Sequence, residues 1–213
     1  MGNMEIKDKI FDFAYELALR DATMRGAYQL QQENKKVSSN AYEKAKENIR
    51  EKARDVVKEY VDGIVAGEYP DFNETAQKLN KCVADPGFRF GNIQKLLNMT
   101  IKYIYMGYYT NPEIKSNFKE CHCPMDGIML SKVVNAYKNL ENKNEEYLKY
   151  EIGEGKYSRA FSEISWSKIE FDDGLKNKYS KKIYDNYQEM VKALAKEKDL
   201  IPIEYDFDEW NKD

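Results

Sequence analysis

A lysine and an aspartate in the middle of the chain have the types and surroundings from which a catalytic site can be built. Lys95 lies in a segment with helical spacing, 92–108, that is otherwise largely apolar, and Asp126 follows Pro124 at the start of another such segment. Partial burial of a lysine favours its neutral amine, which is a nucleophile. The free N–H groups and the dipole at a helix start favour an ionised carboxylate. An amine and a carboxylate of this kind form a pair that can cleave an N-glycosidic bond.

The elements that must position this pair follow from the glycines, the prolines and the apolar spacing. Asp85-Pro86-Gly87 stops the preceding helix, and Asn92 is a residue type that caps a helix. Pro124 suits the first position of a helix, where its missing N–H costs nothing. The predicted order is a hairpin, a helix, a connector and a second helix, over 86–91, 92–108, 109–120 and 124–140.

This order resembles the helix-hairpin-helix DNA glycosylases, which have a glycine-containing hairpin, a helix with a lysine, and Pro-x-Asp at the next helix. The separation of Lys95 from Asp126 looks most like that of the archaeal 8-oxoguanine glycosylase branch. The resemblance covers residues 85–130. It implies that Lys95 is a Schiff-base nucleophile and Asp126 its partner carboxylate, in a protein that removes a modified base from DNA.

The sequence departs from that family in two ways. Phe88-Arg89-Phe90 separates Gly87 from Gly91, whereas the family hairpin usually runs Pro-Gly-x-Gly. The chain has three cysteines, so it lacks the four that hold the iron–sulfur cluster of some relatives, and no cofactor is expected. The stretch is also similar to uncharacterised bacterial and phage proteins, which imply no function.

Aromatic and cationic side chains interleave around the pair, an arrangement typical of sites that stack on a base. For each ring the alternative is a place in the helical core. The predicted substrate-binding residues are Phe88, Arg89, Phe90, Gln94, Asn98, Lys102, His122 and Trp166.

A second group with chemical potential is Cys121-His122-Cys123, together with Cys82. Three adjacent residues cannot all point at one tetrahedral metal without strain, and the spacing matches no common zinc pattern, so no metal is predicted. The alternatives are a metal site assembled by the fold, a Cys–His nucleophile, and buried thiols beside a packed histidine. Because three cysteines cannot all pair with one another, we expect free thiols in a reducing compartment, the cytoplasm.

The composition predicts an all-α protein of about eight helices. Only 11 glycines and 5 prolines interrupt 213 residues, which favours long helices. We expect a single compact domain over 1–213, with the alternative of two helical lobes that meet near 141–156. Besides the two helices above, the apolar spacing predicts helices over 4–30, 40–66, 71–84 and 172–198, and an extended strap over 200–213.

Within the first of these helices, one set of residues at helical spacing is predicted to face the core. This set is Ile6, Ile10, Phe13, Ala14, Leu17, Ala18 and Met24.

Charge and hydropathy restrict the partners. No run of about 18 apolar residues occurs, so no membrane partner is expected. A net charge of −3 weighs against a protein that grips nucleic acid by bulk positive charge, although 34 lysines and arginines can form a local basic face. The leading hypothesis is a DNA glycosylase/lyase with DNA or a nucleotide as partner. The rival is a non-enzymatic helical binding protein, bacterial or phage, that captures a nucleotide or a partner protein. The oligomeric state stays open.

Overall fold

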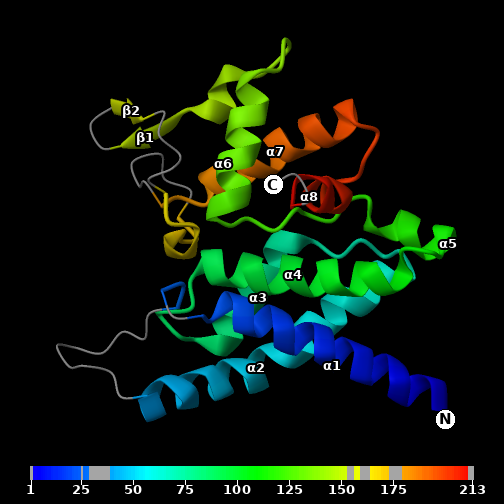
Figure 1. Cartoon of the computed structure of the whole chain (residues 1–213). Helices are drawn as coiled ribbons and strands as arrows, with labels where there is room; N and C mark the ends of the chain where they lie inside the picture. Colours follow the sequence, from blue (N-terminus) through cyan, green and yellow to red (C-terminus); the bar gives the residue numbers. More distant parts are fainter. Residues whose placement is uncertain are drawn as a thin grey trace. The chain divides into compact units, whose positions relative to one another are not determined.

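A computed structural model of the chain describes residues 2–24, 26–28, 39–152, 156–158, 164–172 and 179–210 (Figure 1). The predicted all-α class is confirmed, with eight α-helices among the described residues. The chain divides into two compact units, unit 1 (Met1–Phe118) and unit 2 (Lys119–Asp213). The stretch 141–156, suggested as a lobe boundary, lies within unit 2.

Where unit 1 is described, it has five helices and a 3₁₀ turn: α1 (Gly2–Ala22), α2 (Ser39–Ala66), α3 (Phe72–Val83), α4 (Phe90–Tyr108), α5 (Pro112–Lys115) and η1 (Ser116–Phe118). The helices predicted over 40–66, 71–84 and 92–108 are confirmed to within two residues at each end. The predicted connector 109–120 contains α5 and η1, because Asn111 caps a short helix that has Pro112 at its first position.

Helix α4 is the core of unit 1. Every residue from Phe90 to Lys102 is buried, and the helix packs against α1, α2 and α3. The Asn92 amide joins it to the chain after α1, since Nδ2 donates to the carbonyl oxygens of Ala22 at 2.8 Å and Ala27 at 3.0 Å. A polar side chain thus satisfies two backbone acceptors at the end of α1.

The predicted core face of α1 is wrong in most of its residues. Ile6, Ile10, Phe13 and Met24 are exposed, while Ala14 and Ala18 are buried as predicted. The helix has two apolar faces, and the one that carries small residues is buried because alanines let α4 approach closely. The buried face consists of Phe11, Ala14, Tyr15, Ala18, Leu19 and Ala22.

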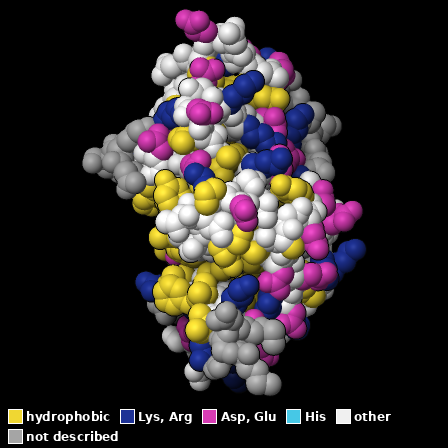
Figure 2. All heavy atoms as spheres, turned by 90° about the vertical axis from the view of Figure 1, so that its right-hand side faces the viewer, with side chains coloured by type: hydrophobic (Ala, Val, Ile, Leu, Met, Phe, Trp, Pro, Cys, Tyr) yellow, Lys and Arg dark blue, Asp and Glu magenta, His cyan; other side chains and the backbone are white. Residues whose placement is uncertain are grey.

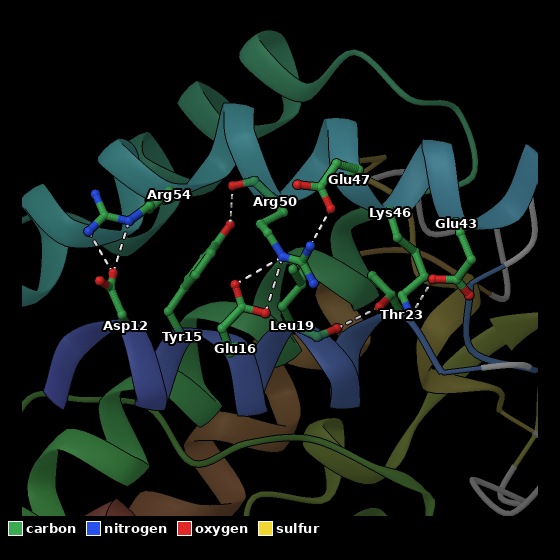
Figure 3. A network of polar contacts seen from close by, with 10 residues as sticks. All are labelled: Asp12, Tyr15, Glu16, Leu19, Thr23, Glu43, Lys46, Glu47, Arg50 and Arg54. Carbon is green, nitrogen blue, oxygen red and sulfur yellow. Dashed lines mark hydrogen bonds and ion pairs between the residues drawn. The ribbon is translucent and has the colours of Figure 1, made fainter. Parts of the chain in front are cut away.

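Helices α1 and α2 are joined by polar contacts along their length (Figure 3). Arg54 donates to Asp12 Oδ1 from Nε at 3.0 Å and from Nη2 at 2.6 Å. Arg50 Nε lies 2.9 Å from Glu16 Oε1, and the hydroxyl of Tyr15 donates to the Arg50 carbonyl oxygen at 2.8 Å. These contacts fix which face of α1 is turned toward α2.

The described residues of unit 2 form three helices, two 3₁₀ turns and one short antiparallel strand pair: α6 (Gly127–Lys138), η2 (Glu145–Leu148), β1 (Tyr150–Ile152), β2 (Lys156–Ser158), η4 (Trp166–Lys168), α7 (Lys182–Glu197) and α8 (Pro202–Trp210). In the strand pair, Tyr150 is opposite Ser158 and Ile152 is opposite Lys156. Of the helix predicted over 172–198, residues 173–178 lie outside the described part of the chain.

The extended strap predicted over 200–213 is wrong, because the chain forms α8 there. Pro202 occupies the first turn, where its missing N–H is not needed, and Glu204 follows as an acidic residue at the helix start. Ile203 and Tyr205 are fully buried, so the apolar residues that suggested a strap pack from a helix instead.

Candidate functional site

Helix α4 begins earlier than predicted, which changes the hairpin before it. The backbone N–H of Arg89, the N-cap residue, donates to Asn92 Oδ1 at 3.1 Å. Asn92 therefore caps the helix from inside its first turn, and Phe90 and Gly91 belong to α4 rather than to a hairpin over 86–91. What precedes α4 is a tight turn in which the Phe88 N–H donates to the Asp85 carbonyl at 3.0 Å.

Six polar side chains are buried along α4, and four of them lie on one side of the helix, apart from Asn92 and Thr100. Gln94, Lys95, Asn98 and Lys102, named here the polar stripe, follow one another at helical spacing, as the sequence indicates. Both lysines are deeply buried, with Lys95 at 7% and Lys102 at 8% exposure. Asn98 Nδ2 donates to Gln94 Oε1 at 3.2 Å. Lysines are rarely buried to this extent, so the polar stripe is the least ordinary feature of unit 1.

The two phenylalanines that precede the polar stripe belong to the core of unit 1. Phe88 meets the ring of Tyr28 edge-on at 6.4 Å, and Phe90 meets Phe72 in the same way at 6.4 Å. Both are almost fully buried. Their burial gives these rings a structural role, and Arg89 between them lies half-buried at the N-cap of α4.

Asp126 caps α6 in unit 2. Its Oδ1 accepts the backbone N–H of Met129 at 2.9 Å, and the side chain is half-buried. The helix starts at Gly127, so the prediction that Pro124 begins it is wrong. Asp126, as the capping residue, comes just before the first helical residue. Pro124 therefore lies two residues before Asp126, in the extended segment that leads into α6.

Helix α7 holds that extended segment in place. Gln188 Oε1 accepts the Cys123 N–H at 3.0 Å, and Gln188 Nε2 donates to the Cys123 carbonyl at 2.8 Å. The hydroxyl of Tyr187 donates to the Pro124 carbonyl at 3.0 Å. The Gln188 amide thus bonds to both backbone groups of Cys123, as the backbone of a neighbouring strand would in a sheet. Sequence reasoning missed Gln188, although a glutamine on the apolar face of a helix is a signal that could have been found.

His122 and Trp166, the predicted binding residues of unit 2, are both half-buried. His122 Nδ1 lies 2.8 Å from the Tyr184 hydroxyl on α7, and this contact orients the imidazole. Trp166 opens the short turn η4.

The cysteines of unit 2 are buried thiols. Burial raises the pKa of Cys121 to about 12, and the charge of Glu120 adds to the shift. Cys123 is fully buried, with Sγ 3.1 Å from the Tyr187 hydroxyl. A thiol that keeps its proton is a poor nucleophile. Within the described ranges, no three His, Cys, Asp or Glu side chains are arranged to hold a metal ion.

Two open grooves border α2 in unit 1. The larger, of about 550 Å³, lies along α2 and the turn after it, and the smaller, of about 320 Å³, lies between α2 and the start of α3. Carboxylates outnumber lysines in both, with Lys58 in the larger groove and Lys78 in the smaller, and Glu59 lines each of them. As far as the structure describes the chain, neither groove is lined by a residue of the predicted site. The linings include Asp55, Glu59, Asp62 and Glu68 in the larger groove and Glu59, Asp71 and Glu74 in the smaller.

The predicted site residues are therefore distributed over both units. Unit 1 contains Lys95 with the rest of the polar stripe, and unit 2 contains Asp126, His122 and Trp166. That Lys95 and Asp126 act together stays a prediction. No protein family matches this chain, and no curated protein or solved structure matches it either. Among the described residues, no helix combines the length and the apolar character needed to cross a membrane.

Proposed function

We propose that the protein is a DNA glycosylase/lyase-like enzyme that acts on a modified base through Lys95 and Asp126. The observation that supports this is the polar stripe, with two deeply buried lysines on the core helix of unit 1. Lysines are rarely buried this deeply, and departures of this kind from ordinary core composition are typical of functional sites.

In the proposed reaction, the Lys95 amine attacks C1′ of the sugar and the bond from C1′ to the base breaks. The base departs with the bonding electrons, and the Asp126 carboxylate stabilises the developing oxocarbenium ion and accepts the lysine's proton. Loss of the ring oxygen from C1′ gives a Schiff base, which β-elimination and hydrolysis then resolve. Trp166 is the half-buried ring proposed to stack on the flipped base.

Borohydride trapping tests the proposal. The protein is incubated with duplexes that carry one modified base or one abasic site, and borohydride reduces any Schiff base to a stable adduct. We expect an adduct with the wild type, none with Lys95→Met, and a much smaller yield with Asp126→Asn. Lys81→Met, at an exposed lysine of α3, is the matched control and should leave the yield unchanged. Absence of an adduct on every duplex, the abasic one included, would contradict the proposal.

A non-enzymatic binding protein is the second candidate, and the acidic lining of the two grooves on α2 favours it. Carboxylates such as Asp55 and Glu59, in a chain of net charge −3, repel DNA phosphates and suit a basic partner. A thermal-shift screen distinguishes the two functions, because a basic peptide that raises Tm and is recovered unchanged indicates capture without turnover. We place either activity in the cytoplasm, where free thiols stay reduced.

A further inference from the structure

The segment that leads into α6 is deeply buried, although it forms no helix or strand of its own. Cys123, Pro124 and Met125 are all buried, and they come directly before Asp126. A segment of this kind lacks the regular partners that a helix or a sheet gives to backbone N–H and C=O groups, so other groups must bind them. Whatever binds this segment also decides where the Asp126 carboxylate lies.

Two consecutive residues of α7 bind the segment. Gln188 Oε1 accepts the Cys123 N–H at 3.0 Å, and Gln188 Nε2 donates to the Cys123 carbonyl at 2.8 Å. The Tyr187 hydroxyl donates to the Pro124 carbonyl at 3.0 Å. Tyr187 is fully buried and Gln188 nearly so. Water is therefore kept from these bonds, and a hydrogen bond in such surroundings is stronger than one at the surface.

Gln188 differs from the polar groups of the protein surface. On the face that Figure 2 shows, charged side chains of both signs lie among hydrophobic ones, which is the ordinary composition of a surface. Gln188 instead lies on the buried face of α7, together with Tyr184 and Val191. Both ends of its amide bond to Cys123, so this side chain acts on the segment and not on solvent.

Asp126 is the last residue of the segment. Its Oδ1 accepts the Met129 N–H at 2.9 Å, which ties the carboxylate to the first turn of α6. Burial raises the pKa of the Tyr187 hydroxyl, and nearby charges, that of Asp126 among them, add to the shift, so the two side chains are within electrostatic reach of each other. Because only Met125 separates Pro124 from Asp126, a displacement of the segment also displaces the carboxylate.

We propose that Gln188 and Tyr187 are positioning residues for the Asp126 carboxylate, an inference that rests on the proposed function. They act through the segment that they bind, and not on the DNA. A displacement of about 1 Å in a catalytic group can slow a reaction about a hundredfold. Loss of these bonds should therefore slow the step in which Asp126 accepts the Lys95 proton, and leave the affinity for DNA unchanged.

Borohydride trapping on a duplex with one abasic site tests the proposal, with the protein in excess and its concentration varied. Gln188→Met has nearly the length of the wild-type side chain and makes neither bond to Cys123. Its maximal rate of adduct formation should fall about ten- to a hundredfold, while the half-saturating protein concentration stays that of the wild type. Tyr187→Phe, which loses the bond to Pro124, should show the same pattern to a smaller extent.

Val191→Ala is the matched control. It removes buried volume from the same helix but no hydrogen bond, so it should lower stability and leave the trapping rate unchanged. Circular dichroism checks that each variant is folded at the assay temperature.

Gln188→Glu adds a readout that stability alone would not give. A protonated carboxyl group can accept the Cys123 N–H and donate to the Cys123 carbonyl, as the amide does, whereas an ionised carboxylate can only accept. The ratio of the variant's trapping rate to that of the wild type should therefore rise as the pH is lowered from about 8 to about 5. For Val191→Ala the same ratio should not depend on pH.

The outcomes separate this inference from the proposed function. A wild type that forms the adduct, with Gln188→Met trapping at the same rate, overturns the inference and leaves the proposed function in place. An equal fall in rate for Gln188→Met and Val191→Ala also overturns it, because Gln188 would then only stabilise unit 2. A wild type that forms no adduct overturns the proposed function itself, and the inference with it.

Discussion

The Tyr15 hydroxyl donates to the Arg50 carbonyl oxygen at 2.8 Å, across the interface of α1 and α2 (Figure 3). Tyr15 is almost fully buried, and its ring stacks on Phe11 at 5.8 Å. The ion pair of Arg54 and Asp12, two half-buried residues, lies beside this contact. One interface thus combines a part-buried hydrogen bond with an ion pair that water still reaches.

Tyr15→Phe should lower the free energy of unfolding by about 1 kcal/mol, because it removes the side-chain donor of the Arg50 carbonyl, which keeps its backbone hydrogen bond within α2. Asp12→Ala should cost only about 0.5 kcal/mol, since water reaches this ion pair and screens it. Urea unfolding of both variants measures the difference. An equal or larger loss for Asp12→Ala would show that the ion pair, and not the hydroxyl, holds α1 on α2.

Replacements of Asp126 separate its capping role from its proposed chemistry. Asp126→Ala should lower the free energy of unfolding by about 1 kcal/mol, because the Met129 N–H loses its acceptor. Asp126→Asn keeps a capping oxygen and should stay within about 0.5 kcal/mol of the wild type, while it removes the charge needed for catalysis. Thermal unfolding measures both. A large loss with asparagine would mean that the charge itself stabilises unit 2.

Lys95→Met should keep the free energy of unfolding within about 2 kcal/mol of the Lys81→Met control, because methionine matches the length of the lysine stem and fills the same buried space. Urea unfolding of Lys95→Met, with Lys81→Met as the exposed control, measures the effect. A loss above about 2 kcal/mol relative to the control would instead give Lys95 a structural role.

Stability should fall at alkaline pH through Cys121. Burial raises the pKa of its thiol from 9.0 to about 12, so above pH 9.0 the unfolded chain loses a proton that the folded chain keeps. The folded state then binds more protons, and the free energy of unfolding decreases with rising pH, by up to about 1.4 kcal/mol per pH unit between 9.0 and about 12. Urea unfolding over this window should give a steeper decline for the wild type than for Cys121→Ala. Equal slopes would contradict the prediction.

The sequence allowed the class of the fold and most helix positions in unit 1 to be predicted, because apolar spacing and capping residues are local signals. The polar stripe of α4 was predicted for the same reason, since Lys95, Asn98 and Lys102 share one side of any helix. The core face of α1 could not be predicted. Both of its faces are apolar, and which one is buried depends on how closely α4 can approach, a property of two helices together.

Contacts between residues far apart in the sequence also could not be predicted. Nothing near Cys123 in the sequence indicates Gln188, because the contact depends on how α7 packs within unit 2. The helical form of α8 was missed since Ile203 and Tyr205 satisfy a strap and a helix equally well, and only their burial distinguishes the two. The proposed pairing of Lys95 with Asp126 is of the same kind, because no local signal fixes the distance between residues of separate units.

The bond between Gln188 and Cys123 has a consequence for synthesis on the ribosome. Unit 1 is complete once Phe118 has been made, and domains generally fold as they emerge, the N-terminal one first. Cys123 must wait for a partner 65 residues later in the chain, so its backbone groups bond to water until α7 has left the exit tunnel. During that interval α6 lacks the α7 surface against which it packs, so the nascent first half of unit 2 exposes apolar residues that favour aggregation.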